Sequence, residues 1–338
     1  MDWEKWCLRV SAAAVIGAIL LRLSSGGMLG TVVEALSSPE VLSVMLYLET
    51  GRLVRPAQPQ LPEEIQNTAP EETEQTPLPE QLQEPVQAVF AEADAALVEV
   101  NSVCGYDTDL PALLQQPLDW ELTQQEPTVL ILHTHGTESY TKTEDYRESS
   151  SYRTLDTDYN VVSIGTELAK TLEKGSIKVI HDTTMHDSPS YSSSYSNARK
   201  SIRAYLEKYP SIRMVLDIHR DSVENSDGEQ LRFTAQKDGQ TAAQLMMVVG
   251  TDANGLSHPD WPENMSLAVK LHAQLEKNCP GICRPISFRS QRFNQDLSTG
   301  AMLIEVGSAG NTRAEALLAA QILGQAILEL SHGTAPTE

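Results

Sequence analysis

The sequence predicts an α/β fold, a three-layer α-β-α sandwich built on a mostly parallel sheet. Two observations predict it. From about residue 127 onward, short apolar runs alternate with longer segments whose apolar residues recur at helical spacing. Polar and imidazole groups follow three of the apolar runs, and the carboxyl ends of strands are where open α/β sheets bind their ligands.

The elements follow one another in a regular order. The run V-L-I-L at 129–132 predicts the first buried strand, and the spacing of Val161, Ile164, Leu168 and Leu172 predicts a helix over 160–174. The remaining elements are a strand over 177–180, a helix over 194–209, strands over 214–218 and 245–249, a helix over 264–278, a strand over 302–306 and a helix over 313–330. Asp238-Gly239, within 232–240, predicts a hairpin turn and allows a mixed sheet.

Acidic residues are concentrated in one stretch of the chain. The formal net charge is −21, which excludes a general nucleic-acid binder, because such proteins neutralise phosphates with basic groups. Residues 56–141 contain sixteen Asp and Glu and no Lys or Arg, and 56–90 are rich in Pro, Glu and Gln. Such a composition does not bury enough apolar surface to fold. We therefore expect a mostly disordered linker over 56–126, with one helix over 88–100, and a hydrolase domain over 127–332.

An apolar run near the N-terminus predicts a membrane anchor. Val10 to Leu21 is apolar and is bounded by Arg9 and Arg22, with two Trp before it. The run is shorter than the about 20 apolar residues of a full span, but interfacial Trp and a snorkelling Arg extend it. An uncleaved signal-anchor is the preferred interpretation of residues 1–55, with a cleaved signal peptide and a surface helix as alternatives. The domain is then expected outside the cytoplasm, on a single-pass anchor.

Three strand ends carry the residues that indicate chemistry. The motifs are H-T-H-G-T-E-S-Y at 133–140, D-I-H-R-D-S at 217–222 and E-V-G-S-A-G-N at 305–311. His135, Glu138 and His219 match the ligand set of a catalytic zinc ion (Zn2+), which takes His and carboxylate ligands and leaves a position for water. Glu305 ends an apolar strand and is expected to act as the catalytic general base.

Several assignments stay open at this point. His133 and His135 would share one face of an extended strand, so either could be the ligand; His135 is preferred because Gly136 lets the chain turn and return Glu138 to the metal. Asp217 is interpreted as a partner that orients an imidazole or as a turn acceptor. Arg220 is expected to bind a substrate carboxylate or an oxyanion, with an ion pair to Asp221 as the alternative.

The motifs in combination resemble the stage II sporulation protein P family of spore-forming Firmicutes. The resemblance covers about 127–330 and includes N-V-V-S-I-G-T-E-L-A-K at 160–170. It implies an amidase or zinc-carboxypeptidase-like fold and a membrane-anchored zinc N-acetylmuramoyl-L-alanine amidase, with activity on peptide cross-links also attributed to the family. It further implies peptidoglycan as substrate, stage II sporulation proteins D and M as partners, and a role in septal wall thinning and engulfment.

The resemblance also bears on the third metal ligand. Related amidases place the metal Glu at the start of the helix after the first strand, where this chain has Asp158 and no Glu. Glu138 is kept as the ligand, with Asp158 and Glu144 in reserve. Two other functions remain: a zinc carboxypeptidase or endopeptidase acting on stem peptides, with Arg220, Arg289 or Arg292 capturing a carboxylate, and an inactive membrane-tethered scaffold.

Two further features have less specific interpretations. The four cysteines are too few for a disulfide scaffold, and Cys279 and Cys283 are expected to be incidental thiols. The stretches 190–196 and 284–293 carry aromatic and Arg groups that would suit a glycopeptide groove; a loop and a helix start are the alternative interpretation.

Overall fold

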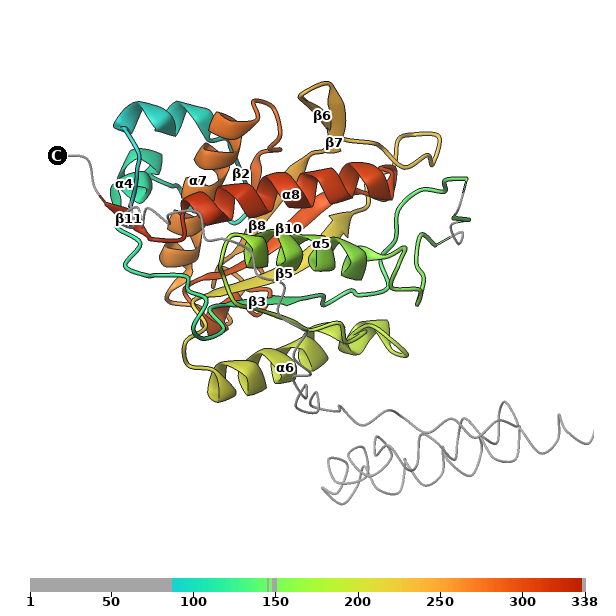
Figure 1. The fold of residues 1–338 in the computed structure, drawn as a ribbon, viewed down its shortest axis with the longest axis horizontal. Helices are drawn as coiled ribbons and strands as arrows, with labels where there is room; N and C mark the ends of the chain where they lie inside the picture. Colours follow the sequence, from blue (N-terminus) through green and yellow to red (C-terminus); the bar gives the residue numbers. More distant parts are fainter. Residues whose placement is uncertain (1–86, 145, 148–150, 336–338) are drawn as a thin grey trace, which may run out of the picture. The chain divides into compact units, whose positions relative to one another are not determined.

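The computed structural model describes residues 87–144, 146–147 and 151–335, and these residues form the predicted α/β fold (Figure 1). The predicted anchor over 1–55 and the linker up to residue 86 lie outside the described residues. Within the described part of the chain, no helix has the length and apolar character that crossing a membrane requires.

A seven-stranded sheet forms the centre of the fold, in the order β2-β9-β8-β10-β5-β3-β4. The strands are β2 (Val100–Ser102), β3 (Val129–Leu132), β4 (Val179–His181), β5 (Met214–Asp221), β8 (Leu245–Gly250), β9 (Ile286–Arg289) and β10 (Ala301–Ser308). Every neighbouring pair is parallel except β10 and β8. The mostly parallel sheet is thus confirmed, as two parallel blocks that run in opposite directions.

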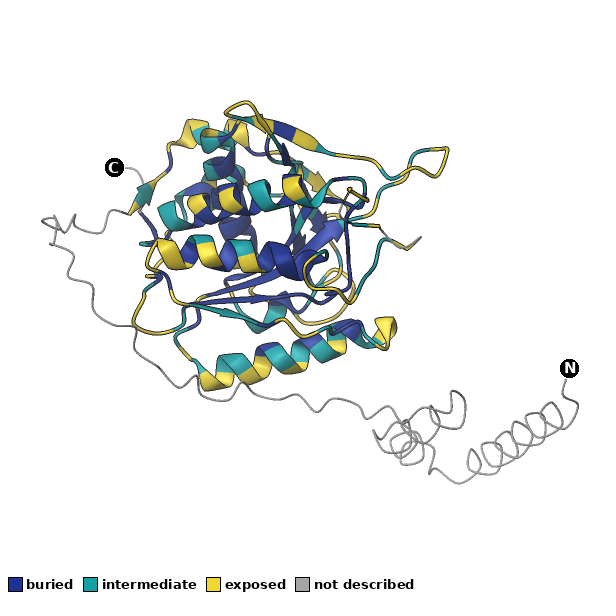
Figure 2. Cartoon of the chain, turned by 45° about the vertical axis from the view of Figure 1, so that its right-hand side comes forward, coloured by how far each residue is buried: buried dark blue, intermediate teal, exposed yellow. Residues whose placement is uncertain are grey.

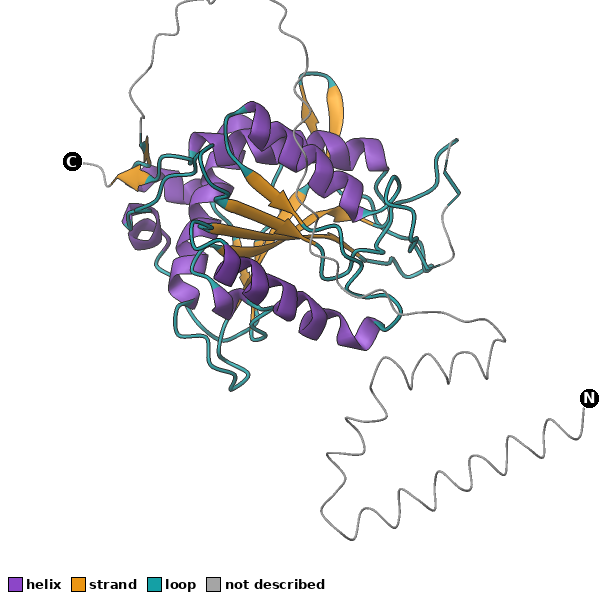
Figure 3. Cartoon of the chain, turned by 60° about the horizontal axis from the view of Figure 1, so that its bottom comes forward, coloured by secondary structure: helices purple, strands orange, loops and turns teal. Residues whose placement is uncertain are grey.

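Helices cover both faces of the sheet, which confirms the three layers (Figures 1 and 3). Helices α5 (Val161–Lys174), α7 (Trp261–Asn278) and α8 (Arg313–Glu329) pack on one face, and α6 (Ser194–Lys208) packs on the other. Side-chain caps fix two of their starts. Asn160 accepts a hydrogen bond from the backbone of Val162, and Thr312 forms a capping box with Glu315.

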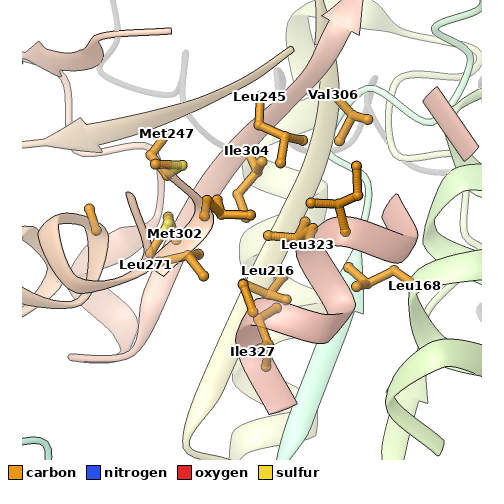
Figure 4. Close-up of a cluster of buried hydrophobic side chains, with 14 of the residues drawn as sticks. Leu168, Leu216, Leu245, Met247, Leu271, Met302, Ile304, Val306, Leu323 and Ile327 are labelled. Atoms are coloured by element: carbon orange, nitrogen blue, oxygen red, sulfur yellow. The ribbon is translucent and has the colours of Figure 1, made fainter. Parts of the chain in front are cut away.

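Side chains alternate along the strands and divide the core into two clusters. Leu216, Met302 and Ile304 point toward α5, α7 and α8 in the larger cluster (Figure 4). Val215 and Ala301 point the other way, toward α6, in a smaller cluster that includes residues of β3 and, at its margin, β4. Figure 2 shows the result: the central strands are buried, while the helices have a buried and an exposed side. No described residue of β8, β9 or β2 belongs to the smaller cluster, so none of the described helices packs on that part of this face.

The folded domain begins before residue 127, the boundary predicted from the sequence. Residues 88–100 form no single helix: β1 (Ala88–Val89) pairs with β11 (Thr334–Ala335), the 3-10 helix η1 (Glu92–Leu97) follows, and β2 adds an edge strand beside β9. Helix α4 (Leu110–Gln115) then packs against α7.

Four apolar side chains pack residues 87–126 against the rest of the domain. They are Phe90, Val98, Leu114 and Leu122, and all four are buried in the larger core cluster. The linker prediction is wrong for residues 87–126 because these side chains are too far apart in sequence to produce a local periodic signal. Each of them nevertheless packs on a surface that the rest of the domain provides.

The predicted hairpin is present but does not belong to the main sheet. β6 (Thr234–Lys237) and β7 (Gln240–Ala243) form a separate two-stranded sheet. Asp238 and Gly239 join them with φ of 51° and 76°, as a tight hairpin turn requires. The main sheet is mixed because β8 runs antiparallel to β10. Among the described cysteines, Cys104, Cys279 and Cys283 are free thiols.

Candidate active site

Three predicted ligands lie together at the carboxyl ends of β3 and β5. His135, Glu138 and His219 each offer one ligand atom, and these atoms lie within 4.8 Å of one another. Nδ1 of His135 is 3.4 Å from Oε1 of Glu138, and Nδ1 of His219 is 3.5 Å from Oε2 of Glu138. All three residues are buried. Two imidazole nitrogens and a carboxylate in this arrangement form a donor set for one divalent cation.

A turn after β3 brings two of these residues to the third. β3 ends at Leu132, and the chain turns so that the backbone N–H of Glu138 donates to the carbonyl of His135 at 3.0 Å. Gly136 lets Met185 pack closely on this turn, because a Cβ there would lie 2.8 Å from the sulfur of Met185 and that side chain would have to move. The backbone N–H of Arg220 also donates to Oε2 of Glu138, at 3.2 Å. The turn that was predicted at Gly136 is therefore present.

His133 lies outside this cluster. The strand ends one residue before it, so the extended geometry that would place His133 and His135 on one face does not apply. His133 instead lies on the α5 face, where Nδ1 donates to the carbonyl of Ile218 at 3.0 Å and Nε2 is 2.9 Å from Nε2 of His181. Helix α5 approaches the two rings at Gly165, where a Cβ would lie 2.6 to 2.7 Å from their atoms. Burial lowers the pKa of His133 to about 3 and that of His181 to about 4.

Outer contacts orient the two imidazoles of the cluster. The ring nitrogens on the side away from Glu138 have polar neighbours: Nε2 of His219 lies 2.9 Å from Oδ1 of Asp217, and Nε2 of His135 lies 3.1 Å from Oγ of Ser194. Asp217 is fixed in turn by Thr134, whose backbone N–H and hydroxyl donate to it at 2.7 and 2.5 Å. Metal-binding histidines usually have such partners, which select the tautomer and hold the ring.

The buried carboxylates favour positive charge between the rings. Burial alone lowers the pKa of His219, but Asp217 and Glu138 outweigh burial and hold this pKa well above its ordinary value. Burial alone raises the pKa of Glu138, yet hydrogen bonds from His135 and His219 keep it well below the usual value. An environment that stabilises a proton here also stabilises a divalent cation at the same nitrogens.

Glu305 lies beside the cluster on the neighbouring strand. It pairs with His219 in the register of β10 and β5. Its Oε2 atom is buried and has no hydrogen-bond partner among the described residues, and burial is the main cause that raises its pKa to about 8. A carboxyl group that titrates near neutrality and has an uncommitted oxygen is suited to proton transfer.

Arg220 and the reserve ligands have different surroundings from those predicted. The Arg220 side chain is buried, and it donates to the carbonyls of Ser139 and Tyr152 at 2.8 and 2.7 Å. It therefore holds the loop after β3 in place, and its NH1 group lies 3.8 Å from Oε1 of Glu138. Glu144 and Asp158 are exposed and lie outside the metal-ligand cluster.

An open cleft of about 550 Å³ gives access to these residues. Its floor includes Met246, Val248 and Leu303, from the part of the sheet that α6 leaves uncovered. Tyr191 and Tyr195 line it from η2 (Tyr191–Ser193) and α6, and the ring of Tyr191 stacks on His135 with 4.5 Å between centroids. Residues of both stretches proposed for a groove, 190–196 and 284–293, line the cleft.

Several residues that support the site were not predicted from the sequence. Arg153 donates to Oδ2 of Asp187 at 2.9 Å, and its NH2 group lies 3.4 Å from Oε1 of Glu138. Asp187 also accepts hydrogen bonds from the backbone and the hydroxyl of Thr137. These contacts join the loop after β3 to segments far away in sequence. No local pattern marks them, since each is a single polar residue in a loop.

The fold and the cluster define the class of the protein: a three-layer α/β protein with a candidate two-histidine, one-carboxylate metal centre at the ends of its strands. The model of the family "Stage II sporulation protein P (SpoIIP)" matches residues 42–328. The chain belongs to this family, as the sequence motifs predicted.

Individual proteins are similar over large parts of the chain. Stage II sporulation protein P of Bacillus subtilis (strain 168) is 26% identical over 276 residues, which are 76% of this chain and 63% of the relative's length. Two solved structures are similar in part: the amidase AmiC2 of Nostoc punctiforme (TM-score 0.37, 13% identity, 60% of this chain and 96% of that one) and the CwlD amidase from Clostridioides difficile in complex with the GerS lipoprotein (TM-score 0.38, 14% identity, 60% and 95%).

Proposed function

We propose that this chain is a zinc-dependent peptidoglycan hydrolase that cleaves the amide bond between N-acetylmuramic acid and L-alanine. The observation that carries the proposal is the cluster of His135, Glu138 and His219, with Glu305 beside it in an open cleft. Membership of the stage II sporulation protein P family supports a role in septal wall thinning and engulfment during sporulation.

The donor set of the cluster fits zinc. His135 and His219 would bind the ion through Nδ1 and Glu138 through a carboxylate oxygen, because these atoms face one another. The neighbours of the outer ring nitrogens, Ser194 and Asp217, would fix the tautomer in which Nδ1 is free to bind. When bound, zinc supplies a Lewis acid that polarises a carbonyl oxygen and acidifies water.

Glu305 is the group that moves the proton in this proposal. Its buried Oε2 accepts a proton from the attacking water as the new carbon–oxygen bond forms. The same oxygen then donates the proton to the amide nitrogen as the carbon–nitrogen bond breaks. The products are the free lactyl carboxylic acid of the sugar and the amine of L-alanine. Burial raises the pKa of the Glu305 carboxyl, which favours donation of the proton to the leaving nitrogen.

The proposal extends to the place of the protein in the cell. We propose that residues 1–55 anchor the chain as a single membrane pass and that the domain works outside the cytoplasm. The apolar run from Val10 to Leu21 and its flanking arginines support the anchor. Family membership is the support for stage II sporulation proteins D and M as partners.

The test uses purified full-length wild type beside His219→Ala and Glu305→Gln. Each protein is analysed for zinc, incubated with peptidoglycan, and its products are identified by mass spectrometry. We expect zinc in wild type and in Glu305→Gln but not in His219→Ala, and free stem peptides from wild type alone. Shortened peptides in place of whole stems would indicate a carboxypeptidase or endopeptidase. A folded protein without zinc and without products would indicate a scaffold.

A further inference from the structure

One arginine in the cleft differs from the other three. Arg153, Arg220 and Arg284 line the cleft, and each lies within 4.0 Å of a carboxylate of the protein. Arg289 also lines the cleft and is exposed, but no carboxylate of the described residues pairs with it. The guanidinium group of an arginine can bind a carboxylate through two parallel hydrogen bonds. Arg289 is therefore the cleft arginine whose charge stays available to a ligand.

The sheet fixes where Arg289 lies relative to Glu305. The two residues are on β9 and β10, which are separated by β8. The register pairs Arg289 with Gly250 and Leu303 with Val248, so Arg289 lies two strands across and four residues along the sheet from Glu305. With about 4.8 Å between strands and about 3.3 Å per residue, the two backbones are on the order of 16 Å apart. About five residues of extended peptide span this separation, and fewer are needed because the arginine side chain extends into the same cleft.

The two sides of the cleft differ in chemistry. On the β9 side, Ser287 and Asn101 pair in register and line the cleft together with Arg289, so this side offers polar donors and a cation. On the α6 side, Tyr191 and Tyr195 line the cleft beside His135. Aromatic rings give sugars a flat contact surface with a polar edge. The proposed substrate has the same asymmetry, since a neutral sugar lies on one side of the scissile amide and an acidic peptide lies on the other.

We propose that Arg289 forms a subsite for a carboxylate of the peptide on the amine side of the scissile bond, within about three to five residues of that bond. The substrate then lies with its sugar toward Tyr191 and Tyr195 and its peptide across β8 and β9. This inference rests on the proposed function, because the scissile amide defines the two sides. Arg289 acts as a specificity residue and takes no part in bond cleavage.

The experiment compares two soluble probes in the full-length wild type and its arginine variants. The probes are a muramoyl tripeptide with free carboxylates and the same compound with every carboxylate converted to a carboxamide. The proteins are wild type, Arg289→Gln and Arg203→Gln; the last removes an exposed arginine of α6 that does not line the cleft. Hydrolysis is measured as kcat and KM. Binding is measured by calorimetry in a Glu305→Gln background, so that it does not depend on turnover.

We expect wild type to bind the free-carboxylate probe about tenfold or more tightly than the carboxamide probe. Arg289→Gln should remove this preference through KM, with kcat changed little, and Arg203→Gln should keep it. Arg289→Lys should restore part of it. Equal affinity of wild type for both probes, or a preference that survives in Arg289→Gln, would overturn the inference. Hydrolysis without preference would leave the proposed function standing, whereas an Arg289-dependent preference without hydrolysis would leave only the subsite.

Discussion

Two pairs of histidines lie at the same end of the sheet and have opposite surroundings. His133 and His181 contact each other directly at 2.9 Å and pack against α5. His135 and His219 have Glu138 between them, and each Nδ1 lies about 3.5 Å or less from a carboxylate oxygen. Burial lowers the pKa values of the first pair, while carboxylates raise the pKa of His219 in the second.

The surroundings of the two pairs show which features distinguish a metal site from a structural contact between histidines. The two rings of each pair are close in space, and His133, His135 and His219 are buried while His181 is partly buried, so proximity of imidazoles does not decide the role. The second pair adds an anion between the rings and access from a cleft, and both features favour a cation. In the first pair, His133 contacts His181 and donates to the carbonyl of Ile218, so the pair holds neighbouring strands together beside α5. H-T-H in the sequence contains one member of each pair.

The largest expected effect separates the two histidines of that motif. His135→Ala should reduce bound zinc from about one ion per chain to near zero and abolish hydrolysis, because it removes a ligand. His133→Gln should keep zinc, because its ring faces α5. Metal analysis of the folded proteins, with circular dichroism to establish folding, checks both. Loss of zinc from a folded His133→Gln protein would contradict the structural role of His133.

The next effect concerns the carboxylate that orients one ring. Asp217→Asn should weaken zinc affinity by about 10- to 100-fold, the usual cost of losing such a partner. The matched control is Asp158→Asn, an exposed residue outside the cluster, which should leave affinity unchanged. Competition with a chelator of known affinity measures both. If Asp158→Asn proves to be the weaker binder, the assignment of Glu138 as third ligand is wrong.

A smaller effect tests the packing of the structural pair. Gly165→Ala places a Cβ within 2.6 to 2.7 Å of the His133 and His181 rings, so we expect it to lower the free energy of unfolding by about 1–3 kcal/mol. Zinc content should not change. Thr166→Ala, at the neighbouring exposed position of α5, should change stability by less than about 0.5 kcal/mol. Urea unfolding followed by circular dichroism gives both values.

The effect expected to be smallest per step of the measurement is the change in stability of the same pair with each unit of pH. Burial lowers the pKa of His181 to about 4, compared with about 6.5 in an unfolded chain. The unfolded state then binds the proton more readily, so the contribution to stability is complete above about pH 6.5 and is lost as the pH falls toward 4, by about 1 kcal/mol per unit. Unfolding at several pH values in a chelator, which removes any effect of zinc, should show a flatter dependence for His181→Asn. Equal slopes would contradict a neutral buried ring.

Much of the fold was predictable because its strands are apolar runs with polar ends. The strand predicted over 129–132 has the bounds of β3, and those predicted over 214–218 and 302–306 lie within β5 and β10. The segment 87–126 was not predictable as part of the domain, because its buried residues Phe90 and Leu114 contact partners far along the chain. The local sequence pattern predicts which residues are buried, but it does not predict which distant residues they pack against.

The candidate site was predictable to the extent that strand ends determine it. His219 and Glu305 are neighbours because β5 and β10 pair in parallel with that register, and parallel strands bring their carboxyl ends to one edge. Arg220 was assigned to substrate because the sequence does not show the backbone carbonyls that it contacts. The direction of His133 depends on where β3 ends, and a shift of one residue reverses the face.

The pairing of β1 with β11 brings the two ends of the described domain together. Ala88 pairs with Thr334, so the chain enters and leaves the described domain at adjacent points. Gln87 lines the same pocket as Thr128 and Arg213, which precede β3 and β5, whereas His219 and Glu305 lie in the carboxyl-terminal halves of their strands. The two ends of the described domain thus lie toward the amino-terminal ends of β3 and β5, away from the metal-ligand cluster. A fluorophore or affinity tag attached next to β1 or β11 would therefore not block the cleft.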